Sequence, residues 1–539
     1  MFNMTALKTG ITPPLLGLLT LGILFLPAAF YFQPNLGGEG MFIPFNSTVW
    51  LATSLVISTA VLCMLSAGHI ALPRYWPGLA ALPVGVIISG FVVESYLPTE
   101  WLFRQLYILG GFLFLLALFQ FDFKTKQRDQ LIILLLLAGL AHALYGISQI
   151  FWPGIYPSLI VPSNGTPYGM FQQINLQASL QATTLLLALY LLSRPLLRQP
   201  GRLLPVLLLT TIFSSSFIVA YAGSRVGLLA TVIGLVIVCM ARWPQLKQRK
   251  ALFIGAIILI VAAGVFGKDG LIRATGKFQD MSVLDDSVAT LGTGSRKNIY
   301  AISLTLLKEA PLFGHGIGSF QKEWHREKVN FLTTHPQAAL PPERLSHPHN
   351  ELLFWMVEGG LVSIAGMLIA AAATLIAALK CGWRRGSSYL ALLLPIGLHT
   401  QVELPFYISN LHWFLLLALL YLILQHRTYA KTLRISTAAS TSLAATAVLF
   451  FAATTAFMLH TLYANAGLIR FLESRMSEPK HLMSGLKNPY FNEISELFMM
   501  RTLLLRDLQS EQQTFVPQFI NWATPYLEYR PMAQIYLDL

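Results

Sequence analysis

Apolar runs long enough to cross a membrane as helices dominate this chain. A helix needs about 20 mostly apolar residues to span the hydrocarbon core, and thirteen runs come near that length. They lie at about residues 15–32, 48–67, 79–95, 101–121, 131–151, 176–192, 203–221, 226–241, 251–267, 352–379, 389–406, 409–425 and 439–459. Charged residues make up only 11% of the chain, against about 25% in soluble domains. We therefore predict an all-α polytopic integral membrane protein with about 13 transmembrane helices.

The basic residues predict the orientation of these helices. With the N-terminus in the cytoplasm, the inside segments hold eighteen Lys and Arg residues, whereas the short outside loops hold only Arg225. Positive charge is retained on the cytoplasmic side, so residues 268–350 and the tail after His460 are expected outside. The net charge of +13 then reflects topology, and no nucleic-acid partner is expected. Residues 1–32 could pass for a cleaved signal peptide, but the many spans that follow favour an uncleaved first span.

Four parts follow from this topology. Residues 1–267 form an N-terminal bundle of spans 1–9, 268–351 a large periplasmic loop, 352–459 spans 10–13, and 460–539 a periplasmic tail. The tail carries apolar residues at helical spacing, which predicts a helical domain; they are Ile494, Leu497, Phe498, Leu503 and Leu504. The loop at 152–175 has no charge and is expected to pack onto the membrane surface. Histidines gathered outside a membrane with an inside N-terminus point to a bacterial inner membrane with a periplasmic active face.

The junction at residues 346–360, SHPHNELLFWMVEGG, is the first candidate site. Pro348 disfavours helix at His347, and Asn350 is a good N-cap, so His349 should lie just before a helix N-terminus. The positive end of the helix dipole there favours a neutral imidazole, which can act as a base or hydrogen-bond acceptor. The alternative interpretation of this sequence is a capped turn with solvated histidines.

Two Gly-Ser-Arg sequences form the second candidate site. Arg225 follows Gly223 and Ser224 between two spans, and Arg296 lies in the large loop within Gly-Thr-Gly-Ser-Arg-Lys-Asn. Arginines beside glycines that let backbone N–H groups approach are suited to a diphosphate. The alternative for Arg225 is an arginine that snorkels to the interface. The glycine-rich phrase at 311–320 lacks the lysine of a P-loop, and we interpret it as a backbone turn.

Other polar residues leave alternatives open. Gln172, Gln173 and Asn175 precede the sixth span, where their amides could bind sugar hydroxyls or cap the helix. His347 and His349 offer two metal ligands where catalytic zinc usually has three, so we expect no metal and no cofactor. Glu94, Glu100, Arg104 and Glu403 lie near outer ends of spans as possible interfacial ion pairs, with no assigned role.

In this order, the landmarks resemble the Wzy_C / O-antigen ligase superfamily over about residues 160–430. They are a Gly-Ser-Arg between spans, a large loop with a second Gly-Ser-Arg, Pro-Leu-Phe-Gly-x-Gly-Ile-Gly, and His-x-His-Asn-Glu leading to Glu-Gly-Gly-Leu. The resemblance implies inverting, metal-independent transfer of a glycan from undecaprenyl diphosphate in the periplasm.

The resemblance also implies roles for residues. Arg225 and Arg296 would bind the diphosphate and His349 would be the catalytic histidine. Asn175 corresponds to the family's Gln-Pro-Asn phrase, although Ile174 replaces the proline. Gln172, Asn175, His347 and Asn350 are further candidates for substrate binding.

Three acceptors are compatible with the superfamily: a protein hydroxyl, the lipid A core, or a second lipid-linked glycan. The thirteenth span and the tail resemble protein O-oligosaccharyltransferases of the pilin glycosylation ligase (PglL) type, which favours a periplasmic protein such as pilin. A transporter is the remote alternative. It would be expected to carry ionisable residues in mid-span and inverted repeats, and this chain has almost no mid-span charge.

Overall fold

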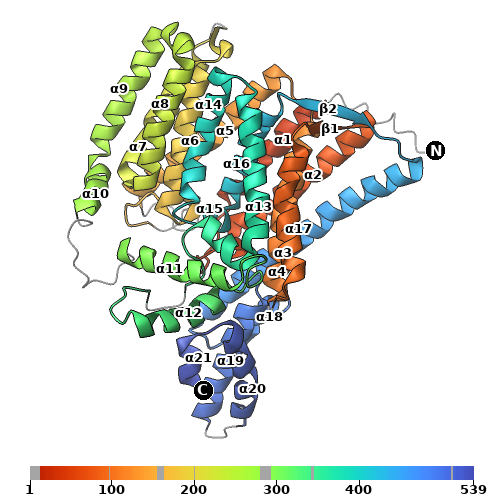
Figure 1. The fold of residues 1–539 in the computed structure, drawn as a ribbon, viewed down its shortest axis with the longest axis vertical. Helices are drawn as coiled ribbons and strands as arrows, with labels where there is room; N and C mark the ends of the chain where they lie inside the picture. The colour runs from red at the N-terminus through yellow and green to blue at the C-terminus, as the bar shows by residue number, and fades with distance from the viewer. Residues whose placement is uncertain are drawn as a thin grey trace.

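Helices make up nearly the whole computed structural model, which describes residues 12–95, 97–153, 163–198, 201–279, 293–341, 345–510 and 514–539. Thirteen of its helices form or flank the bundle in Figure 1. They are α1 (Pro13–Phe25), α2 (Pro44–Ala67), α3 (Trp76–Val92), α4 (Pro98–Gln120), α5 (Thr125–Phe151), α6 (Ile174–Leu192), α7 (Leu203–Ala222), α8 (Arg225–Lys247), α9 (Lys250–Phe266), α13 (Glu351–Leu379), α14 (Trp383–His399), α16 (Asn410–Leu424) and α17 (Thr437–Glu473). Each coincides with one of the thirteen apolar runs.

Nine helices in the described part of the chain are long and apolar enough to cross a membrane. The number is ten if α9 and α10 (Lys268–Gln279), which meet at a 68° bend, count as one span. Helices α3 and α14 have 17 residues each, and α16 has 15. The chain is therefore an all-α polytopic membrane protein, and the count of thirteen spans stays a prediction.

Helix α6 lies at the centre of the bundle, and 89% of its apolar stretch is buried. It packs against α5, α7, α8 and α14, which explains why its apolar residues are not confined to one face. Before α6, Met170 and Phe171 are buried against the bundle, while residues 154–162 of that loop lie outside the described residues. A short antiparallel sheet pairs β1 (His69–Pro73) with β2 (Thr428–Thr432), with His69 opposite Thr432; the sequence did not predict it.

The helices outside the bundle gather at one end of it, the lower end in Figure 1, which we call the loop face. They are α11 (Thr293–Glu309), α12 (Phe320–Thr334), α18 (Met483–Leu486), α19 (Asn492–Gln509), α20 (Val516–Tyr529) and α21 (Ala533–Asp538). The tail has its own small core, which includes Leu497, Leu504, Phe519 and Leu527. The predicted helical tail is confirmed, and α17 runs without interruption from the last predicted span into it. That the loop face is periplasmic stays a prediction.

Helix α13 is broken at Gly360, whose φ is 61° and ψ −164°. This backbone conformation is essentially restricted to glycine. A Cβ on Gly360 would lie 2.5 Å from the backbone of Leu312, so the glycine-rich segment Pro311–Ser319 can pass directly against the break.

Backbone groups opened by the break pair with that segment. Four hydrogen bonds join them: His315 N to Val357 O at 2.8 Å, Gly316 N to Glu358 O at 3.1 Å, Leu361 N to Pro311 O at 2.9 Å, and Val362 N to Leu312 O at 3.1 Å. The segment predicted as a backbone turn thus completes a broken helix, and it separates the first two turns of α13 from the long apolar part.

Candidate active site

His349 lies directly before α13 and has a left-handed backbone, with φ of 54°. The side chain of Asn350 accepts a hydrogen bond from the backbone N–H of Leu353 at 3.0 Å, so the predicted N-cap is confirmed. Few residues with a Cβ adopt positive φ. The strained residue next to the cap directs its ring away from the helix and toward the turn that follows α14.

In that turn, Glu403 meets His349. The Nδ1 of His349 lies 2.8 Å from Oε1 of Glu403, and the two side chains are 17% and 9% exposed. Burial alone would raise the pKa of Glu403, but the hydrogen bond from His349 and the neighbouring imidazoles outweigh it and hold that pKa below its ordinary value. An ionised carboxylate can only accept, so Nδ1 carries the hydrogen and Nε2 is left as the basic nitrogen. We call His349 and Glu403 the dyad.

The sequence placed Glu403 near the end of a span at 389–406 and gave it no role. That boundary is wrong, because α14 ends at His399. The following turn pairs with the start of α13 instead: Glu351 N donates to Thr400 O at 2.9 Å, and the side chain of Asn350 donates to Gln401 O at 3.0 Å. A carboxylate among apolar residues at the end of a span was the signal available in the sequence.

His347 supports His349 from the other side. Its Nδ1 accepts the backbone N–H of His349 at 3.3 Å, and the two rings meet edge to face with centroids 4.6 Å apart. Burial, with His349 acting in the same direction, lowers the pKa of His347 to about 4, although Glu403 opposes the shift. His347 is therefore neutral near pH 7 and acts as a hydrogen-bond acceptor.

Glu403 also adds a third potential metal ligand to the two histidines. One donor atom from each of His347, His349 and Glu403 lies within 4.8 Å of the others. The ligands of a tetrahedral zinc, each about 2.0–2.2 Å from the ion, lie more than about 3 Å apart, whereas Nδ1 and Oε1 of the dyad are at 2.8 Å. That separation is a hydrogen bond between the two atoms, so the arrangement favours a proton between them.

Arg225 is the first residue of α8, and its side chain is exposed. Ser224 caps this helix by accepting from Gly227 N at 3.3 Å. A Cβ on Gly227 would lie 2.9 Å from the side chain of Ala178 in α6. The beginnings of α6 and α8 therefore lie side by side.

The start of α6 is also connected to the dyad. Ser179 Oγ lies 2.9 Å from His399 Nδ1 at the end of α14, and Glu403 N donates to His399 O at 3.0 Å. Asn175 is one helical turn before Ser179 and lies on the same face of α6.

Gln172 points elsewhere, because its side chain donates to Asn35 Oδ1 at 3.0 Å. Gln173 is the N-cap residue of α6, but its side chain makes no capping hydrogen bond there. The side chain of Gln173 therefore does not cap α6, although capping was one of the two predicted roles.

Arg296 lies in the first turn of α11 and is half-buried. Helix α11 packs against both segments that carry the dyad. Its residues Ile299 and Ile302 share a hydrophobic cluster with Leu345, Phe354 and Leu404. One residue separates Leu345 from His347, and Leu404 follows Glu403. The structure thus brings the helix of Arg296 over the dyad.

The dyad thus lies where the start of α13, the turn after α14 and helix α11 meet, and the starts of α6 and α8 pack against each other. Helix N-termini and arginines favour anions, and a neutral imidazole with an oriented Nε2 can accept a proton.

Comparison with protein families gives two matches. The model described as O-antigen ligase matches residues 209–369, and the model described as virulence factor membrane-bound polymerase, C-terminal, matches residues 388–539. Arg225, Arg296 and His349 fall in the first match, and Glu403 falls in the second. No curated protein matches the chain. The chain is thus a multi-pass membrane protein, and its two family matches support the O-antigen ligase superfamily.

Proposed function

We propose that this protein is an inverting, metal-independent glycosyltransferase of a bacterial inner membrane. It transfers an oligosaccharide from undecaprenyl diphosphate to Ser or Thr hydroxyls of periplasmic proteins such as pilin. The observation that carries this proposal is the 2.8 Å contact between His349 Nδ1 and Glu403 Oε1, because it orients Nε2 of His349 as a base.

The reaction is a single displacement at the anomeric carbon. The acceptor oxygen bonds to that carbon while the bond from the carbon to the diphosphate oxygen breaks, and the electron pair leaves with the diphosphate. The proton of the hydroxyl moves to Nε2 of His349, and Glu403 stabilises the imidazolium that forms. A base placed in this way contributes about 10²–10⁴-fold to the rate. One displacement inverts the anomeric configuration and forms no covalent glycosyl-enzyme.

The leaving group needs stabilisation of charge more than a proton. Arg225 at the start of α8 and Arg296 in the first turn of α11 hold the diphosphate, and the positive ends of both helix dipoles act in the same sense. Such preorganised cations stabilise negative charge that grows in the transition state. Asn175, at the start of α6, binds hydroxyls of the transferred sugar in this proposal.

The helical tail favours a protein as the acceptor. Helices α18 to α21 lie on the same face as α11 and α12 (Figure 1), where they extend the surface beside the proposed site. A polymerase that joins two lipid-linked glycans is the second candidate, because the family model that matches the tail is described as a membrane-bound polymerase. The lipid A core is the third candidate acceptor.

Deletion of the gene in its host tests the proposal. We expect the glycan to disappear from pilin and periplasmic proteins by intact mass, with lipopolysaccharide unchanged on a gel. The wild-type gene should restore the glycan, and a gene with His349→Ala should not. A gene with His335→Ala should restore it, because His335 is exposed at the end of α12. Altered lipopolysaccharide with unchanged proteins would select a ligase to lipid A or a polymerase instead.

A further inference from the structure

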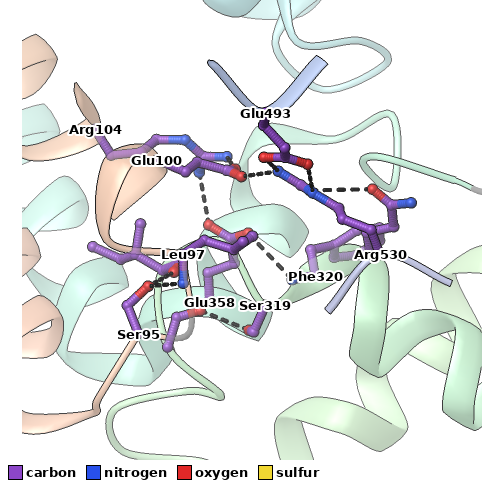
Figure 2. A network of polar contacts seen from close by, with 12 residues as sticks. Ser95, Leu97, Glu100, Arg104, Ser319, Phe320, Glu358, Glu493 and Arg530 are labelled. Atoms are coloured by element: carbon purple, nitrogen blue, oxygen red, sulfur yellow. Dashed lines mark hydrogen bonds and ion pairs between the residues drawn. The ribbon is translucent and has the colours of Figure 1, made fainter. Parts of the chain in front are cut away.

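A chain of ion pairs, partly buried at the C-terminal helices and buried at Glu358, joins those helices to the helix that begins at the dyad (Figure 2). We call it the ion-pair chain. Its links are Glu493 Oε1 to Arg530 Nε at 2.8 Å, Arg530 Nη2 to Glu100 Oε2 at 2.8 Å, Glu100 Oε1 to Arg104 Nη2 at 2.8 Å, and Arg104 Nη1 to Glu358 Oε2 at 2.6 Å. The ion pair expected for Glu100 and Arg104 is therefore present, and it is one link of a longer connection.

Arg104 contacts both pieces of chain that carry the dyad. Its guanidinium lies 4.6 Å from the ring centre of Phe354 and 4.8 Å from that of Tyr407, and these two rings meet edge to face at 5.4 Å. Phe354 is in the first turns of α13 after His349, and Tyr407 is in α15 (Pro405–Ile408), which follows Glu403. The position of Arg104 therefore affects how His349 and Glu403 face each other.

Arg104 is held in turn by two carboxylates. Glu358, with a side chain 2% exposed, also accepts the backbone N–H of Phe320 at 3.3 Å. Glu100 has its second oxygen on Arg530, and Arg530 also donates to Gln321 Oε1 at 3.2 Å. A guanidinium shared in this way has little freedom to move, because each of its partners is fixed by another group.

Arg530 balances the negative charge of the ion-pair chain. With it, three carboxylates face two guanidiniums. Without it, Glu493 and one oxygen of Glu100 would lose their partner in the ion-pair chain, and Arg104 would have to balance both Glu100 and Glu358. Removing one partner from a partly buried ion pair leaves charge uncompensated. Arg104 would then be drawn toward Glu100 and away from Phe354 and Tyr407.

We propose that Arg530 is a positioning residue for glycosyl transfer, which makes the C-terminal helices part of the catalytic unit. Arg530 fixes Glu100, Glu100 fixes Arg104, and Arg104 sets the alignment of the two halves of the dyad. This inference rests on the proposed function of the dyad, and it assigns the tail a role at the reacting centre besides any contact with the acceptor.

The test compares full-length Arg530→Gln and Arg530→Lys with Arg501→Gln. Arg501 is the matched control, because its Nε pairs with Asp538 at 2.6 Å inside the tail and does not belong to the ion-pair chain. Hydrogen–deuterium exchange of residues 345–358 is measured without substrate. Transfer is measured with the lipid-linked glycan extracted from the host and its pilin.

We expect Arg530→Gln to speed exchange at the start of α13 and to lower kcat by roughly 10- to 100-fold, the scale for a misaligned catalytic group. KM for the lipid-linked glycan should change little, because Arg225 and Arg296 are untouched. Arg530→Lys keeps the charge but loses the fork, so it should fall between wild type and Arg530→Gln. Arg501→Gln should match wild type in both measurements.

Unchanged exchange and kcat in Arg530→Gln would overturn the inference. So would equal losses in Arg501→Gln, which would assign the effect to packing of the tail. If Arg530→Gln does not fold, the same comparison with Arg530→Lys decides. A fully active His349→Ala would refute the proposed function separately, because the exchange measurement does not depend on transfer.

Discussion

His349 holds a left-handed backbone conformation, with φ of 54°, that costs a residue with a Cβ about 1–3 kcal/mol. The contacts around it offset that cost: His347 accepts its N–H, Glu403 accepts from its ring, and Asn350 caps the next helix. The strain is therefore local and serves to point one ring at one carboxylate.

Replacing His349 by Ala should lower kcat by roughly 10²-fold or more, the usual scale for the loss of a general base. His347→Ala should cost much less, because His347 only supports its neighbour. Both rates come from purified enzyme with the lipid-linked glycan. Excess chelator should leave wild-type activity intact; a loss that added metal restores would instead assign His347, His349 and Glu403 to an ion.

The rate should fall on acidification, because a protonated imidazole cannot accept the proton of the hydroxyl. The hydrogen bond from His349 and the neighbouring imidazoles hold the pKa of Glu403 below its ordinary value, which favours the ionised carboxylate that the mechanism uses. The pH profile of kcat on folded protein measures this. A faster rate at about pH 5.5 than at about pH 7.5 would show that a protonated histidine is needed, as expected for a group that only binds the diphosphate.

Glu403→Gln keeps the size of the side chain and an acceptor oxygen but removes the charge that stabilises the imidazolium. We expect kcat to fall by more than roughly tenfold with a smaller change in KM, as for a group that acts mainly in the transition state. Glu323→Gln, in α12 outside the dyad, is the control. Equal kcat in Glu403→Gln and wild type would remove Glu403 from the mechanism.

Arg225→Lys and Arg296→Lys should both impair transfer, and the Ala variants should be worse. Lysine keeps the charge but cannot hold two phosphate oxygens with a planar fork. The expected readout is a lower kcat/KM for the lipid-linked glycan in each variant. Full activity of Arg296→Ala would assign that residue to the structure of α11.

The sequence predicted those features that a few neighbouring residues are enough to indicate. Asn350 and Glu351 mark a helix start, and a Gly-Ser-Arg between two spans marks Arg225. It could not pair His349 with Glu403, which lies 54 residues further along the chain, because only the packing of α13 against the end of α14 brings them together. The same limit applies to Arg530, which reaches Glu100 from the C-terminal helices.

At the scale of elements, hydrophobic runs were sufficient to locate all thirteen helices of the bundle, because burial in lipid requires long apolar stretches. They could not show the end of α14 at His399. There the chain turns to make hydrogen bonds with Asn350 and Glu351, a tertiary effect. Nor could they show the break in α13, because Glu-Gly-Gly-Leu lies within an apolar run that continues on both sides.

Gly360→Ala tests the importance of that break. The new Cβ would lie 2.5 Å from backbone atoms and force a φ of 61° on alanine, so we expect a loss of about 1–3 kcal/mol or more in unfolding free energy. Gly397→Ala in α14 is the control, since its Cβ would meet no heavy atom within 4 Å in the described structure. Thermal unfolding of the purified proteins measures both. Equal melting temperatures would mean that α13 can close at Gly360.

At the scale of the whole molecule, orientation stays a prediction from eighteen inside basic residues against one outside. A reporter active only in the periplasm should work when fused after Thr333 or Leu539 and be silent after Arg249. Alkaline phosphatase activity in cells measures this. A silent fusion at Leu539 would remove the thirteenth span, and with it the main reason to favour a protein acceptor.

The opening in α13 also constrains how the chain can enter a bilayer. Peptide groups left without partners in lipid cost several kcal/mol each, and Glu358, Gly359 and Gly360 are buried in the finished protein. Their partners lie in Pro311–Ser319, which the ribosome completes before α13. These peptide groups can therefore be paired only when α13 meets the earlier segment. The dyad is completed later still, because Glu403 follows α13 and α14 in the chain, so a half-inserted chain has no assembled centre.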